Sequence, residues 1–74
     1  MSQPPISVWV VYDHPTDQPE DFIARRFDNG KPTEVCIRHK VLSGVQVLLA
    51  MNYPNLRRYP RNPKDDLVIV EMWM

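Results

Sequence analysis

The chain has 74 residues, with nine basic and nine acidic side chains and a formal net charge of zero. A hydrophobic fraction of 43% excludes a disordered chain, and the length allows a single domain spanning residues 1–74. The apolar runs at 6–12 and 41–51 are too short to cross a bilayer. The single Cys36 excludes a disulfide and no Cys/His set has zinc spacing, so we expect no metal or cofactor.

The first predicted elements are a disordered end, a strand and a loop. We expect residues 1–5 to be disordered. Residues 6–12 are rich in β-branched and aromatic side chains, which are typical of a strand. Residues 13–21 contain two prolines and four acids and are expected to form a loop.

Asn29-Gly30 lies between two alternating runs, 22–27 and 33–38, and predicts a β-hairpin. Both central positions of a type I′ turn need a positive φ, which Asn tolerates and Gly adopts freely. A two-residue loop sets the register of the two strands. The expected opposed pairs are Asp28–Lys31, Phe27–Pro32, Arg25–Glu34, Ala24–Val35 and Phe22–Ile37.

This register divides the hairpin side chains between two faces. The face expected to enter the core carries Phe22, Ala24, Val35 and Ile37. On the other face Arg25 gains an opposed acid in Glu34, and Asp21 is a partner for Arg38. Arg26 lies near the tip of the core face and has no opposed acid in the hairpin.

The second half of the chain predicts one helix and one further strand. Apolar residues at helical spacing from Leu42 to Leu49 indicate a helix, with Ser43 or a neighbour as its N-cap. Residues 52–66 contain three prolines and are expected to be a loop, with at most a short extended piece at 56–59. Residues 67–73 form the last strand. The expected fold class is α+β, a four-stranded, mainly antiparallel sheet in the order β-β-β-α-β with one helix packed on one face.

The first and last predicted strands are apolar on both faces, and one short helix covers only one face of a sheet. The second face needs the proline-rich loops or a second subunit. A chain of this length is also marginally stable alone. The leading functional prediction is therefore a small non-enzymatic protein-interaction module that forms a homodimer.

The charges are segregated along the chain. Residues 22–64 contain all nine basic residues, whereas residues 1–21 and 65–74 contain acids and no base. Either the acidic ends fold back onto the basic middle, or the middle is an exposed surface that binds an anion or a partner. The candidate residues for such binding are Arg26, Arg38, Lys40, Arg57, Arg58, Arg61 and Tyr59. The alternative function is therefore nucleic-acid binding, although a pI near 6.7 is below the usual range.

Two motifs that could carry chemistry have plainer interpretations. Asp13 and His14 are adjacent on an extended chain, so their side chains are expected to point to opposite faces, with Asp13 bonding turn amides. Cys36 is expected to be a buried, apolar cysteine. Because no set of nucleophile, base and orienting group can be assembled, we expect no enzymatic activity.

The acids near the C-terminus could bind a divalent cation but are expected to have structural roles. Asp65 and Asp66 are expected to close the turn before the last strand and to pair with Arg61 or a hairpin arginine. Together with Glu71 they are also the expected partners of Arg26. That pairing is predicted because a buried arginine without a partner costs several kcal/mol.

The two ends of the chain carry distinctive motifs. Residues 9–26 read WxVYDHPxDxPxxFxARR, and residues 60–73 read PRxPxDDxxIVExW. With these motifs the chain resembles a small uncharacterised bacterial protein family. The resemblance covers most of the chain and implies one cytoplasmic domain without a particular activity. The lone cysteine and the lack of a signal-peptide pattern independently favour the cytoplasm.

Overall fold

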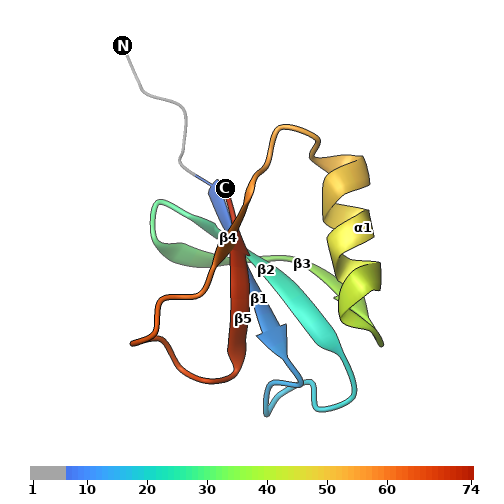
Figure 1. Ribbon diagram of the computed structural model, residues 1–74, viewed down its shortest axis with the longest axis vertical. Coiled ribbons are helices and arrows are strands. Elements are labelled where there is room, and N and C mark those ends of the chain that lie inside the picture. The colour runs from blue at the N-terminus through green and yellow to red at the C-terminus, as the bar shows by residue number, and fades with distance from the viewer. Residues whose placement is uncertain (1–6) are drawn as a thin grey trace.

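Five strands and one helix follow one another in the computed structural model, which describes residues 7–74 (Figure 1). The elements are β1 (Ser7–Asp13), β2 (Phe22–Asp28), β3 (Lys31–His39), α1 (Leu42–Asn52), β4 (Arg58–Pro60) and β5 (Ile69–Trp73). The expected disorder of residues 1–5 lies outside the described residues. Within residues 7–74, no helix combines the length and the hydropathy needed to span a membrane.

The strands form one antiparallel sheet in the order β3-β2-β1-β5-β4. The α+β class is confirmed, but the sheet has five strands, not the predicted four. The additional strand, β4, is three residues long and pairs with β5 from Arg58↔Trp73 to Pro60↔Glu71. The sequence predicted at most a short extended piece at 56–59 and not a strand paired with β5, because alternation cannot be detected over three residues in a proline-rich segment.

The predicted hairpin turn is confirmed. Asn29 and Gly30 have φ values of 53° and 81°, and Asp28 pairs with Lys31 as the two-residue loop requires. Beyond Phe27 the register differs from the prediction. Arg26 faces three residues of β3, 33–35, so that β3 bulges there.

Thr33 stabilises this bulge with its hydroxyl group. The hydroxyl donates a hydrogen bond to the carbonyl of Arg26 (2.8 Å) and accepts one from the amide of Val35 (3.2 Å). Because the register shifts by two residues, the paired side chains on both sides of the bulge keep their predicted faces. The opposed pairs change, however: Arg25 faces Cys36 and not Glu34, and the expected core residue Val35 is 43% exposed.

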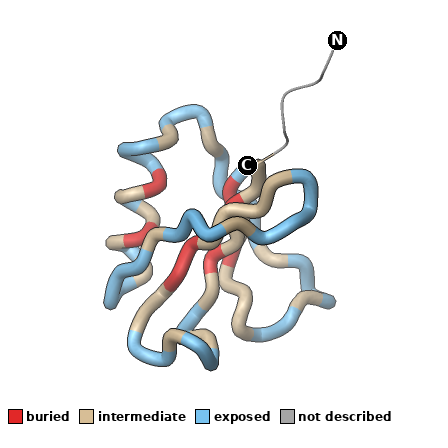
Figure 2. Tube along the Cα trace, turned by 180° about the vertical axis from the view of Figure 1, so that it is seen from behind, coloured by how far each residue is buried: buried red, intermediate tan, exposed pale blue. Residues whose placement is uncertain are grey.

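One face of the sheet is closed by α1 and by the segment that follows it. The helix packs on β2 and β3. The ring of Tyr53, just after the helix, lies 5.0 Å from that of Trp9 in β1. The resulting core comprises Trp9, Val11, Ala24, Val45, Leu49 and Trp73, with Phe22, Ile37, Leu42, Tyr53, Leu56 and Val70 packed around them. Figure 2 shows the buried segments along the central strands and on the helix.

The start of the helix differs from the prediction. Its N-cap is Val41, which makes no side-chain capping bond, so the expected cap at Ser43 is not formed. The ring of His39 lies at the start of the helix, where its Nδ1 accepts a hydrogen bond from the Val41 amide (3.2 Å). A Cβ atom on Gly44 would lie 2.2 Å from that nitrogen. The glycine therefore lets the helix pass close to His39.

Glu71 is the buried polar residue of the closed face. Its carboxylate accepts hydrogen bonds from Gln46 Nε2 on the helix (3.0 Å) and from Trp73 Nε1 on its own strand. These donors satisfy both carboxylate oxygens inside the protein. Glu71 is therefore a core acceptor, and the prediction that it partners Arg26 is wrong.

Candidate functional site

The face of the sheet opposite α1, called the open face here, is covered only in part. Ile23 is buried on this face, with 2% of its surface exposed, next to the loop that joins β1 to β2. The remaining apolar side chains on it are half-buried or exposed. They are Val8, Val10 and Tyr12 of β1, Phe27 of β2, Tyr59 of β4, and Ile69 and Met72 of β5.

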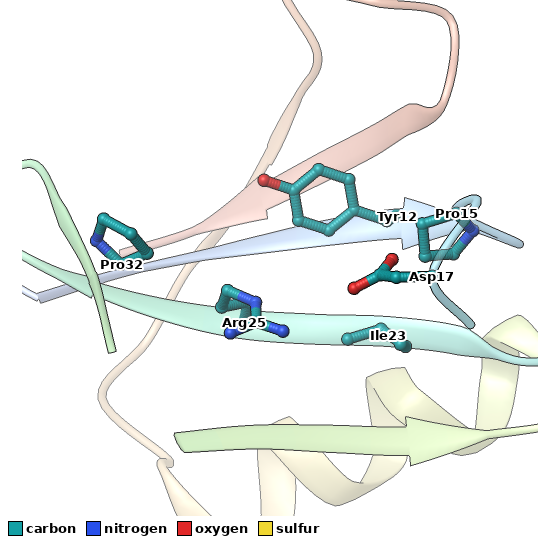
Figure 3. Close-up of a pocket in the computed structure, with 6 residues that line it drawn as sticks. All are labelled: Tyr12, Pro15, Asp17, Ile23, Arg25 and Pro32. Carbon is teal, nitrogen blue, oxygen red and sulfur yellow. The ribbon is translucent and has the colours of Figure 1, made fainter. Parts of the chain in front are cut away.

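A pocket of about 400 Å³ lies on the open face over β1 and β2. It is lined by Tyr12, Pro15, Asp17, Ile23, Arg25 and Pro32 (Figure 3). Its floor is formed by the strands, one wall comes from the β1–β2 loop, and the other wall is the proline at the start of β3. A pocket of this size, in which three apolar residues meet three polar ones, is large enough for a small molecule.

Arg25 is the cation of this pocket. It is half-buried, and its Nη1 donates a hydrogen bond to the carbonyl of Thr33 (3.1 Å). No carboxylate of residues 7–74 lies within ion-pair distance of its guanidinium. The predicted pair with Glu34 is therefore wrong, because the bulge in β3 moves Glu34 away from the position opposite Arg25.

Tyr12 and Asp17 complete the polar part of the pocket. Partial burial raises the pKa of the Tyr12 phenol, while the positive charge of Arg25 lowers it and the negative charge of Asp17 raises it. The phenol therefore lies within the electrostatic reach of both charges. Figure 3 shows the three side chains grouped around one space.

Arg26 lies on the opposite, closed face and has a partner that the sequence analysis missed. Its Nε and Nη2 donate to the two carboxylate oxygens of Asp28 at 2.9 and 3.0 Å. Asp28 also accepts a hydrogen bond from the Ser7 hydroxyl (2.8 Å). The hydrogen bond from Arg26, followed by that from Ser7, lowers the pKa of Asp28, and the bond to Asp28 raises the pKa of Arg26.

The predicted basic set does not form one surface. Arg38 lies on β3 with Lys40 just beyond it, at one edge of the sheet, whereas Arg57, Arg58 and Arg61 surround β4 at the other edge. With strands about 4.8 Å apart, the two edges of a five-stranded sheet are separated by roughly 19 Å. Tyr59 lies on β4 with the second group. Nucleic-acid binding gains no support from this arrangement.

Most of these arginines have local contacts. Nη1 of Arg38 donates to the Gln18 side chain (3.1 Å), and not to the predicted Asp21. Nη1 of Arg61 donates to the backbone carbonyl of Asp65 (3.1 Å), and not to its carboxylate. Arg58 and Tyr59 line a second hollow of about 340 Å³ at the β4 edge, together with Pro60, Val70 and Glu71. The nearby acid Glu71 makes this hollow a poor anion site, although its carboxylate is bonded to Gln46 and Trp73 in the core.

We expected the acidic segments 1–21 and 65–74 to form ion pairs with the basic segment 22–64. These pairs are not found among residues 7–74. Among residues 7–74 the ion pairs are Arg26–Asp28 and the exposed pair His14–Asp13. Asp65 and Asp66 do close the turns before β5, because their carboxylates accept from the amides of Asn62 (3.1 Å) and Val68 (3.2 Å). That part of the prediction is confirmed.

Two further predictions are wrong. The side chains of Asp13 and His14 do not point to opposite faces. His14 has a positive φ of 48° and is not extended, and its Nδ1 contacts the carboxylate of Asp13. Cys36 is exposed, because it lies on the open face of the edge strand β3. Among residues 7–74, no group of three His, Cys, Asp or Glu side chains is arranged to hold a metal ion.

None of the protein-family models, curated proteins or solved structures with which the chain was compared matches it. The resemblance of its two end motifs to a small bacterial family therefore stays a prediction. The pocket residues Tyr12, Asp17 and Arg25 were not among the predicted site residues. The sequence did contain a signal for this pocket: Ile23 and Arg25 alternate onto one face of their strand, and the loop at 13–21 leads into that strand.

Proposed function

We propose that this protein is a small, non-enzymatic interaction module that self-associates through the open face of its sheet. The observation that carries the proposal is the row of half-buried apolar side chains on the face opposite α1. In a chain of this length a covered face adds needed stability, because a single small core supplies only about 3–5 kcal/mol.

The open face is larger than the outer side of the helix. Its size therefore favours the open face as the surface of self-association. Five strands about 4.8 Å apart give a face roughly 24 Å wide, and β1, with seven residues at about 3.3 Å per residue, makes it about 23 Å long at its centre, although β5 and β4 have only five and three residues. A helix of 11 residues is about 16 Å long and presents a strip about 10 Å wide. Stable interfaces bury about 800 Å² per partner, so only the sheet approaches the required area.

The edges of the sheet are poorly suited to pairing with another strand. The β3 edge contains Pro32 and the bulge at 33–35, and the β4 edge is three residues long and ends at Pro60. Proline, bulges and short edge strands all discourage strand addition. Contact between open faces is therefore the more accessible mode of self-association.

The test is the molar mass in solution, measured by light scattering at micromolar concentration. Met72 pairs with Val10 and Tyr59 in the middle of the β1–β5–β4 half of the open face. We expect the wild type to have a dimer mass and Met72→Lys to have a monomer mass, because a lysine there would bring its charge into the interface.

Val47→Lys is the matched control, since Val47 is 54% exposed on the helix. It should keep the dimer mass, and circular dichroism should show that both variants are folded. A monomeric wild type, or equal dissociation of the two variants, would refute the proposal.

A further inference from the structure

The pocket on the open face presents two opposite charges that do not neutralise each other directly. Asp17 and Arg25 both line it, yet they do not form an ion pair within 4.0 Å. Two opposite charges held apart across a cavity with apolar walls fit a ligand that carries both charges itself.

We propose that this pocket binds a small zwitterion, a free α-amino acid with an apolar side chain. Arg25 binds the carboxylate, because a guanidinium presents parallel N–H donors that match carboxylate geometry. Its Nη1 is held by the Thr33 carbonyl, which positions the group before the ligand arrives. Tyr12 lines the same pocket, and we expect its hydroxyl to donate a second hydrogen bond to the carboxylate.

Asp17 binds the ammonium group of the ligand. It is contributed by the β1–β2 loop and faces the same space as Arg25 from the other side (Figure 3). Its negative charge also works against ligands with several negative charges, such as phosphate esters. The pocket thereby favours a neutral zwitterion over an anion.

The apolar side chain of the ligand lies against Ile23, Pro15 and Pro32. These residues form a floor and two walls without hydrogen-bonding side chains, so a branched or aromatic group gains stability there by leaving water. The volume of about 400 Å³ is near the lower end for ligand pockets, which favours a single amino acid over a peptide.

The experiment is a titration of the ¹⁵N-labelled protein with three probes, followed by amide chemical shifts. L-leucine carries both charges, N-acetyl-L-leucine lacks the ammonium, and L-leucinamide lacks the carboxylate. We expect leucine to bind most tightly, with shifts centred on Ile23 and Arg25, and each altered probe to bind about tenfold more weakly. That factor is the order of a lost hydrogen bond to a charged group.

Two pocket variants assign the contacts. Asp17→Asn should weaken leucine binding about tenfold, whereas N-acetyl-leucine should bind no more weakly, because it has no ammonium group and is repelled by the Asp17 charge. Arg25→Gln should weaken the binding of both of these probes, because the neutral amide removes the charge that binds their carboxylate. Arg58→Gln, an exposed arginine at the distant β4 edge, is the control and should bind leucine like the wild type.

The same titration on Met72→Lys separates this inference from the proposed self-association. All six lining residues come from one chain, so a monomeric variant should bind leucine at least as well as the wild type, in which a partner on the open face competes for the same surface. The inference is overturned if millimolar leucine shifts no pocket amide, if the three probes bind equally, or if Asp17→Asn leaves leucine binding unchanged.

Discussion

The two faces of the sheet differ in how completely their polar groups are satisfied. On the closed face, Glu71 receives donors from Gln46 and Trp73, and no buried side-chain nitrogen or oxygen of residues 7–74 is without a partner. On the open face, Arg25 makes one hydrogen bond to a backbone carbonyl and faces Asp17 across a pocket. The closed face holds the fold together, and the open face is the surface that we propose for binding.

The two faces differ because a chain of 74 residues is too short to cover both of them. One helix and the segment after it are enough to cover one side of the sheet, and there the large apolar residues Trp9, Leu49 and Trp73 are buried. On the other side the β1–β2 loop reaches only as far as Ile23. The division into a stabilising face and a proposed binding face can be tested by substitutions on each side.

The largest expected effect is on the closed face. Leu49 is fully buried, and Leu49→Ala should lower the free energy of unfolding by about 2–5 kcal/mol through lost contacts and a residual cavity. Because a core of this size supplies only about 3–5 kcal/mol, the variant should lose a large part of its stability. Circular dichroism with urea denaturation measures the change.

Met51→Ala is the matched control on the same helix. Met51 is 75% exposed, so the free energy of unfolding should change by no more than about 0.5 kcal/mol. If Leu49→Ala proved as stable as Met51→Ala, the core would not depend on the helix, and the two faces would be energetically alike.

The next effect concerns the buried carboxylate. Glu71→Ala removes the acceptor for Trp73 Nε1 and Gln46 Nε2, and one unsatisfied buried donor costs about 1–3 kcal/mol. We therefore expect a loss of that size in the free energy of unfolding, read from tryptophan fluorescence during urea denaturation. Glu34→Ala, at an exposed position on β3, should be close to neutral. Equal stability of the two variants would contradict a structural role for Glu71.

The sequence predicted the hairpin because its signal is local. Asn29 and Gly30 are adjacent, and the left-handed backbone they need is disfavoured for most other residues. The bulge in β3 depends on a hydrogen bond from Thr33 to the carbonyl of Arg26 across the hairpin, which no alternation pattern indicates. The register prediction therefore held at the tip and failed beyond it.

The candidate site was predicted less well because it depends on which strands are neighbours. The basic residues are close in sequence, but the sheet order sends Arg38 to one edge and Arg58 to the other. The pocket arises where the loop carrying Asp17 returns over β2, and a loop path cannot be read from composition. The partner of Arg26 was missed because only opposed strands were considered, whereas Asp28 lies two residues along the same strand and so on the same face.

The smallest expected effect tests the pair of Arg26 and Asp28 at the rim of the closed face. The hydrogen bond from Arg26 and then that from Ser7 lower the pKa of Asp28 in the folded protein. In the unfolded chain an aspartate has a pKa of about 3.9. The stabilisation is therefore fully present above that value and is lost as the pH falls through the lower pKa of the folded state.

Asp28→Asn should be less stable than the wild type at neutral pH, by less than Glu71→Ala, because both members of the pair are about one-third exposed. Its stability should also fall less steeply than that of the wild type below about pH 4, since asparagine does not titrate. Urea denaturation across pH 2–7 measures both differences. Glu20→Gln, an exposed position in the β1–β2 loop, should keep the acid dependence of the wild type. If Asp28→Asn also kept it, the contact between Arg26 and Asp28 would contribute nothing to folding, and the closed face would owe its stability to apolar packing and Glu71 alone.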